Sequence, residues 1–149
     1  TDKEIADKVV QQIHNHVFYS IFDWVTVEVS NGVVTLNGWV HLPWGDQQFV
    51  NEAQKVPGVL EVKNNIKHEL GSDELRLRLA RLIYNDPRFE YYAYDQDPPI
   101  HIIVTGSQVI LEGQVRTASD KSWAQSLLLF NADVGTIQND LVVNPNLSY

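Results

Sequence analysis

The sequence contains an internal duplication, and this feature constrains the fold more than any other. A shift of 70 residues aligns residues 4–15 with residues 74–85, and a shift of 75 aligns the apolar alternation of residues 27–40 with that of residues 102–115. A repeat of this length indicates one supersecondary unit that is used twice. We therefore expect two domains, residues 1–70 and residues 71–149, with the extra residues of the second repeat inside residues 89–99.

Hydrophobic spacing predicts the same elements in the same order in both repeats. Each repeat opens with an amphipathic helix and continues with two alternating strands, a second helix and a last strand. The expected elements are residues 5–16, 25–29, 34–40, 46–55 and 59–67 in the first repeat, and residues 75–83, 100–104, 109–115, 119–131 and 135–143 in the second. The predicted fold class is α+β, with two tandem α-β-β-α-β repeats. Each is a three-stranded mixed sheet with two helices on one face.

Composition excludes several classes of protein. Of 149 residues, 44% are hydrophobic, which favours a globular chain over a disordered one. No apolar run approaches the roughly 18 residues of a membrane span, so we expect no transmembrane segment. The net charge of -8 argues against nucleic acid as a partner, because that affinity depends on Lys and Arg. The absence of cysteine excludes disulfides and thiolate metal sites.

A spaced pattern of glycine, valine and asparagine occurs in both repeats and resembles the BON family, named for bacterial OsmY and nodulation proteins. In the first repeat the pattern consists of Val27, Val29, Gly32, Val33, Val34, Thr35, Leu36, Gly38, Val40, Val56, Gly58, Val59, Val62, Asn64 and Ile66. The second repeat keeps Gly113 and Asn139, but has Ser107 and Asp133 in place of the other two glycines. The resemblance implies a non-enzymatic bacterial module, periplasmic or at membranes. It also implies links to envelope integrity and osmotic stress, and binding to phospholipid surfaces.

Six positions of this pattern are expected to be structural. Glycine inside a strand usually marks a close approach of two backbones or a bulge, which predicts such a role for Gly38 and Gly113. Asn64 and Asn139 share the inward parity of apolar neighbours, so we expect buried amides that are hydrogen-bonded to a neighbouring loop. The structural set is Gly32, Gly38, Gly58, Asn64, Gly113 and Asn139.

The sequence offers no pattern typical of catalysis or of metal binding. Four of the five histidines lie in the first repeat, but His14 and His16 are about 200° apart around a helix and share no face. Asp95 and Asp97 lack the glycine and the terminal glutamate of a calcium loop, and we interpret their segment as a semi-rigid exposed loop. We expect no catalytic residue, no metal and no cofactor.

Two surfaces are candidate binding sites. Arg76, Arg78, Arg81 and Arg88, with an outward Leu77, predict a cationic helix that contacts anionic phospholipid, although neighbouring carboxylates could instead pair with these arginines. The apolar segment of Trp39, Leu42, Pro43 and Trp44 occurs in the first repeat alone and predicts docking of an envelope protein. The sequence thus leaves a lipid-binding and a protein-docking module open.

Overall fold

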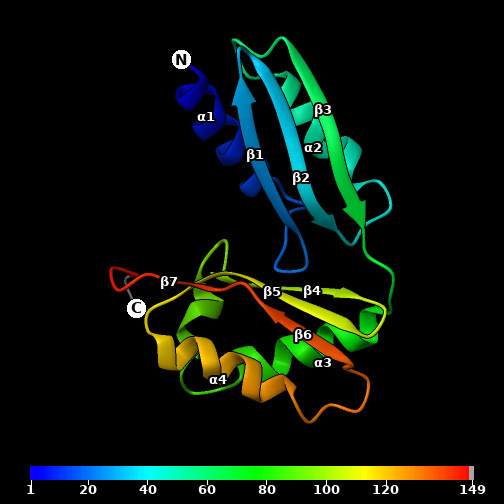
Figure 1. Cartoon of the computed structure of the whole chain (residues 1–149), viewed down its shortest axis with the longest axis vertical. Coiled ribbons are helices and arrows are strands. Elements are labelled where there is room, and N and C mark those ends of the chain that lie inside the picture. Colours follow the sequence, from blue (N-terminus) through cyan, green and yellow to red (C-terminus); the bar gives the residue numbers. More distant parts are fainter. Residues whose placement is uncertain (148–149) are drawn as a thin grey trace. The chain divides into compact units, whose positions relative to one another are not determined.

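A computed structural model describes residues 1–147 of the chain, which divides into two compact units, Thr1–His68 and Glu69–Tyr149. Each unit is α+β and follows the order helix, strand, strand, helix, strand (Figure 1), so the predicted tandem α-β-β-α-β fold is confirmed.

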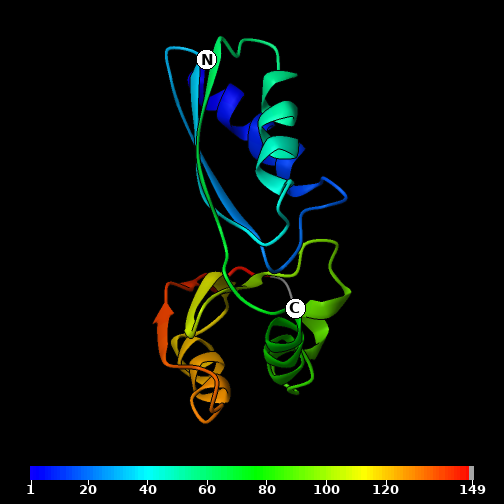
Figure 2. The ribbon, with the colours of Figure 1, turned by 90° about the vertical axis from the view of Figure 1, so that its right-hand side faces the viewer.

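Unit 1 is a three-stranded sheet with two helices packed on one face (Figure 2). Its elements are α1 (Asp2–His14), β1 (Trp24–Ser30), β2 (Val33–Val40), α2 (Gly45–Gln54) and β3 (Glu61–His68). β2 lies in the centre, antiparallel to β1 and parallel to β3. Ile13, Leu36 and Phe49 are among the buried side chains that join the helices to the sheet.

Unit 2 repeats this plan with an additional turn of helix and a divided last strand. Its elements are α3 (Asp73–Tyr84), the 3-10 helix η1 (Glu90–Tyr94), β4 (Ile100–Thr105), β5 (Gln108–Val115), α4 (Ala118–Leu128), β6 (Thr136–Asn139) and β7 (Val142–Val143). Both β6 and β7 pair parallel with β5, the former with its first half and the latter with its end. The single strand expected over residues 135–143 is therefore interrupted between these two short strands.

The extra residues of the second repeat are partly buried, although the segment of Asp95 and Asp97, which was expected to be an exposed loop, contains no buried residue. Phe89 and Tyr92 are buried, and their stacked rings lie 5.9 Å apart as part of the unit 2 core. The neighbouring side chains of Tyr91 and Tyr94 are exposed. Large aromatic side chains bury much apolar area, and this gain draws the segment onto the core.

Gly38 and Gly113 occupy matching places in β2 and β5 and have φ angles of 120° and 108°. A Cβ at Gly38 would lie 1.8 Å from the carbonyl oxygen of Trp24, and one at Gly113 would lie 1.9 Å from that of Pro99. Only glycine permits this approach of the preceding chain to the central strand.

The hairpin turns of the two units differ, because Ser107 stands in unit 2 where Gly32 stands in unit 1. In unit 1 both central residues, Asn31 and Gly32, have positive φ, and their N–H groups donate to the carboxylate of Asp2. In unit 2 only Gly106 has positive φ, and Ser107 follows it. Gly58, with φ of 95°, packs against Ile5 of α1.

Asn64 and Asn139 each attach the third strand of their unit to its second helix, which differs from the role that the sequence predicted. Asn64 is exposed, and its amide donates to Asp46 of α2 over 3.1 Å, while Asn139 donates to the carbonyl of Lys121 in α4 over 2.9 Å. Each side-chain oxygen also accepts the N–H two residues ahead. The expectations of a buried Asn64 and of a loop partner are wrong, because the third strand is attached here to a helix.

Candidate functional site

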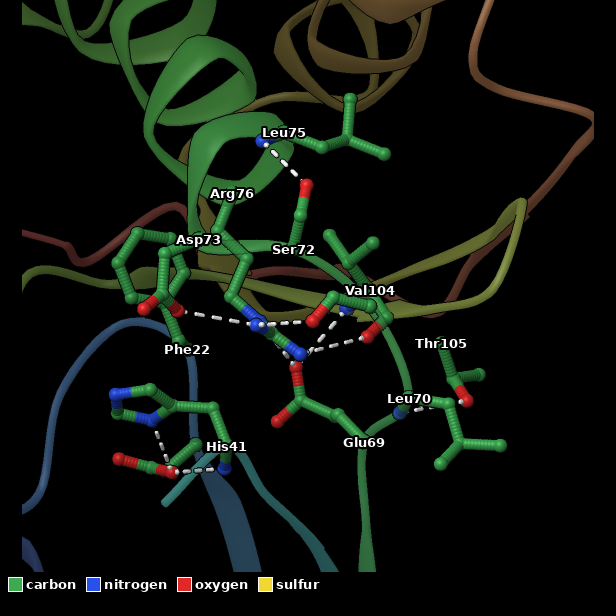
Figure 3. Close-up of polar contacts among 12 residues, drawn as sticks. Phe22, His41, Glu69, Leu70, Ser72, Asp73, Leu75, Arg76, Val104 and Thr105 are labelled. Carbon is green, nitrogen blue, oxygen red and sulfur yellow. Dashed lines mark hydrogen bonds and ion pairs between the residues drawn. The ribbon is translucent and has the colours of Figure 1, made fainter.

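Arg76 is not available for lipid contact, which corrects the cationic set drawn from the sequence. Its side chain is 4% exposed and lies in the fold of unit 2, where Figure 3 shows it among Glu69, Asp73 and Val104. The Nε group donates to Glu69 over 3.3 Å, and Nη1 donates to Asp73 over 3.2 Å. Glu69 also accepts the N–H of Val104, so this buried pair fixes the start of unit 2 onto β4.

Arg78 and Arg88 are exposed but paired with carboxylates. Arg78 donates to Asp133 over 2.7 Å and to Glu74 over 3.4 Å, and the hydrogen bond to Asp133 raises the pKa of Arg78 above its ordinary value. Arg88 contacts Asp120 over 3.5 Å and lies over the indole ring of Trp123 at 5.2 Å. The contact with Glu74 is the pairing with a neighbouring carboxylate that the sequence left open, whereas Asp133 and Asp120 are distant in the sequence.

Arg81 differs from the other arginines of this region. Its guanidinium makes no ion pair or hydrogen bond with any residue in the range 1–147, and the residue is exposed. Two leucines of the same helix flank it, Leu77 at 48% exposure and Leu82 at 39%. Helical spacing places residues 77, 78, 81 and 82 on one side of α3.

A shallow depression lies beside Arg81 near the end of α3. Arg78, Arg81, Leu82, Asn85, Asp86 and Pro87 line it. The carboxylate of Asp86 is engaged on both oxygens, by the N–H of Arg88 and by the indole N–H of Trp123. Both oxygens of Asp86 therefore already accept hydrogen bonds from within unit 2. The depression presents the cation of Arg81 beside the apolar side chain of Leu82.

Two exposed apolar side chains of unit 2 were not among the site residues that the sequence predicted. Leu129 is 54% exposed and Phe130 is 96% exposed, directly after α4. Phe130 belongs to the segment that leads to Asp133, the partner of Arg78 on α3. The run Leu127-Leu128-Leu129-Phe130 was the available signal, since one helix face cannot bury four consecutive apolar residues.

The predicted docking segment of unit 1 is divided between two surfaces. Trp39 stands on the sheet face without helices, where Lys67 lies 5.3 Å above its ring. Trp44 precedes α2, is 50% exposed, and meets Phe18 edge to face at 6.4 Å. Leu42 and Pro43 connect the two, half-buried and exposed respectively. The exposed Val17 and Phe18 extend the Trp44 surface and were also missed.

Titratable groups in unit 1 are used in local pairs. His41 lies 2.9 Å from Asp23, and His68 lies 3.1 Å from Asp46. Burial would raise the pKa of Asp46, but hydrogen bonds from Asn64 and His68 lower it below its usual value. Among residues 1–147, no group of three or more His, Asp or Glu side chains is arranged to hold a metal ion.

The fold and these surfaces define a tandem α+β module with exposed apolar and charged patches. The sequence model of the BON domain family matches residues 1–69 and 88–145. The chain therefore belongs to the BON domain family, as the resemblance predicted. BON domains occur in periplasmic and envelope proteins.

Two solved structures, both of CdsD, a structural protein of the type III secretion system of Chlamydia trachomatis, are similar to this chain. One structure is of the C-terminal domain of CdsD, and its sequence is 12% identical to this chain. The match covers 95% of this chain and 98% of that chain, with a TM-score of 0.34. The other is 13% identical, covering 95% and 92% with a TM-score of 0.33. A search of curated proteins found no match. In the described part of the chain, no helix has the length and apolar character needed to cross a membrane.

Proposed function

We propose that this chain is a non-enzymatic module of a bacterial envelope protein, and that it binds anionic phospholipid surfaces weakly through the exposed side of α3. The observation that carries the proposal is Arg81, a cation with no partner among the described residues, between the exposed Leu77 and Leu82. A cation placed beside exposed apolar side chains suits a headgroup region, where phosphates lie above acyl chains.

The balance of charges sets the expected strength. Residues 69–149, which make up unit 2, contain six basic and eleven acidic residues, so the unit as a whole is repelled by an anionic leaflet. A basic residue near such a leaflet contributes about 1 kcal/mol, and charges farther than about 8 Å are screened at physiological salt. Arg78 contributes less than Arg81 because Asp133 and Glu74 already neutralise it. The binding is therefore weak and sensitive to salt.

Apolar contact adds to this electrostatic term. Phe130 is almost fully exposed on the segment that reaches Arg78 through Asp133, and burying such a ring gains roughly 1.5–3 kcal/mol. Leu77 and Phe130 would then enter the interface while Arg81 meets the phosphates.

Flotation with vesicles tests the proposal. The wild-type chain is expected to float with phosphatidylglycerol vesicles at low salt, to lose this binding at high salt, and not to float with phosphatidylcholine. Arg81→Glu is expected to lower the bound fraction about tenfold or more, and Leu77→Ser with Phe130→Ser to lower it several-fold. Lys8→Glu, the same charge change on the exposed surface of α1, is the matched control and retains binding. No flotation of the wild type with anionic vesicles at low salt overturns the proposal.

A second function, docking of an envelope protein, is supported by the contact between Phe18 and Trp44. Together with Val17 they form an exposed aromatic and apolar patch that unit 2 lacks at the matching loops, where Thr117 precedes its second helix. Trp44→Ala leaves vesicle binding unchanged and weakens retention of an envelope partner if this patch is the binding surface. Trp39→Ala serves as the control, because Trp39 lies on the other face of the sheet.

A further inference from the structure

The sheet of unit 1 has one face without helices, and a row of opposite charges crosses it. β2 pairs Thr35 with Glu28 of β1 on one side and with Lys63 of β3 on the other. Neighbouring strands are about 4.8 Å apart, so the Cα atoms of Glu28 and Lys63 are separated by roughly 10 Å. α1 and α2 cover the other face (Figure 2), and both charged side chains are exposed.

This row lines a depression in the open face. The residues around it are Glu28, Val29, Ser30, Val33, Thr35 and Lys63. Neither Glu28 nor Lys63 makes a hydrogen bond or ion pair with any residue from 1 to 147, and Thr35 contributes a hydroxyl between them. Some exposed charges of unit 1 have partners, such as Lys3 with Asp7 and Lys55 with Glu52, whereas Lys8 and Glu61 have none among residues 1–147. What sets Glu28 and Lys63 apart is that both line one depression.

The fold itself does not require this arrangement. In unit 2 the matching row consists of Ile103, Ile110 and Gln138, which carries no charge. The two isoleucines are buried, whereas Glu28 and Lys63 are exposed, so the two sheets have different chemistry at the same place and the charged row belongs to unit 1 alone.

Charge complementarity selects the kind of ligand. A singly charged ligand in the depression meets one attractive and one repulsive charge, and the two effects largely cancel. A ligand with a cationic and an anionic end meets two attractive charges at once. We propose that this depression binds a small soluble zwitterion, with its ammonium group at Glu28, its carboxylate at Lys63 and a hydrogen bond from the Thr35 hydroxyl to that carboxylate.

The strength follows from the exposure of both charges. An exposed ion pair contributes about 0.2–1 kcal/mol, and a charge-assisted hydrogen bond adds a similar or larger amount. The dissociation constant is expected to be on the order of 1 to 10 mM. This site lies in unit 1 and is independent of the lipid contact proposed for α3.

Two-dimensional NMR of the whole 15N-labelled chain tests the inference with 4-aminobutyrate as the probe. We expect saturable shifts of backbone amides in β1, β2 and β3 around Thr35. Butyrate and butylamine, each at matched ionic strength, are the controls with a single charge, and they should bind at least fivefold more weakly. An equal response to either control overturns the proposal, as does the absence of saturable shifts.

Variants separate this site from general surface electrostatics. Glu28→Gln and Lys63→Gln are each expected to weaken binding about fivefold, while Glu61→Gln and Lys67→Gln, outside the depression, retain it. The exchanged double variant E28K/K63E keeps both charges and should bind the probe in the reverse direction with similar affinity. Loss of binding in this folded double variant would count against charge complementarity. Flotation with phosphatidylethanolamine vesicles, without any response to 4-aminobutyrate, would assign the site to a lipid headgroup instead and overturn the soluble ligand.

Discussion

Arg76 and Arg81 lie on the same helix and have opposite roles, which shows how much depends on the position of a single residue. Residues 76, 79 and 83 follow the helical spacing of one face, and Leu79 and Ile83 are buried. Arg76 therefore enters the core, where Glu69 pairs with it. Arg81 shares the other side with Leu77 and stays in solvent. The spacing was present in the sequence, but arginine is so rarely buried that the run of cations was interpreted as a surface.

At this scale we predict that Arg76→Ala destabilises the protein by about 3–5 kcal/mol. The substitution removes the guanidinium that pairs with the buried carboxylate of Glu69, and removing one partner of a buried ion pair is costly. Arg81→Ala is the matched control and should change the free energy of unfolding by less than about 0.5 kcal/mol. Urea denaturation measures both. Similar effects of the two variants would mean that the Glu69–Arg76 pair does not hold unit 2 together.

At the scale of elements, the central strands β2 and β5 depend on one glycine each. Alanine at Gly113 would place its Cβ 1.9 Å from the carbonyl oxygen of Pro99, which is far inside van der Waals contact. The backbone also has a positive φ there, so the side chain is disfavoured twice. Gly106 has a positive φ as well, but its Cβ would meet no atom within 4 Å.

We therefore predict that Gly113→Ala and Gly38→Ala each destabilise their own unit by more than about 3 kcal/mol, while Gly106→Ala costs about 1–2 kcal/mol. Thermal melting measures the loss, and two-dimensional NMR shows which unit is affected. Each core cluster consists of residues of one unit only, so the signals of the altered unit should change first. A cost at Gly113 no larger than at Gly106 would remove the explanation by close backbone approach.

Periodicity predicted the elements well where both repeats follow it, and poorly where they do not. The helices and strands of unit 1 lie within a few residues of the expected ranges, because alternation and helical spacing report directly on burial. Residues 89–99 have no counterpart in the first repeat, so nothing indicated that Phe89 and Tyr92 are buried. The partner of Asn64 could not be predicted either, since contact with Asp46 depends on how α2 crosses the sheet.

The candidate site was predicted only in outline. The sequence placed Leu77 and Arg81 on the outer side of the helix, and they are exposed. The contribution of Phe130 depends on the segment after α4 reaching α3 through Asp133, a contact between residues far apart in the sequence. The row of Glu28 and Lys63 depends on strand register, and the spacing of residues along the chain does not give the pairing between strands.

At the scale of the whole molecule, the chain has an excess of carboxylates, and two of them, Glu112 and Asp140, lie close together. Burial raises the pKa of Glu112 to about 7, with a further contribution from its hydrogen bond with Asp140 and from the charge of Asp140. Asp140 in turn accepts a hydrogen bond from Gln138 over 2.6 Å. The net charge of -8 adds to the cost of ionising one more carboxylate in this pair.

The sign of the pH dependence follows from this raised pKa. Between the unfolded value of 4.5 and about 7, the folded protein binds more protons at Glu112 than the unfolded chain does. The free energy of unfolding therefore falls as the pH rises through this window, and the penalty is complete above pH 7. Because the carboxyl group is half-exposed, solvent screening reduces the effect to about 1–2 kcal/mol.

We predict that Glu112→Gln raises the free energy of unfolding by about 1–2 kcal/mol at pH 8 and leaves it nearly unchanged at pH 4.5. Urea denaturation across this range checks the prediction, with the exposed Glu61→Gln as the control. An equal gain at both pH values would show that the variant acts through packing or hydrogen bonding rather than through the charge of Glu112.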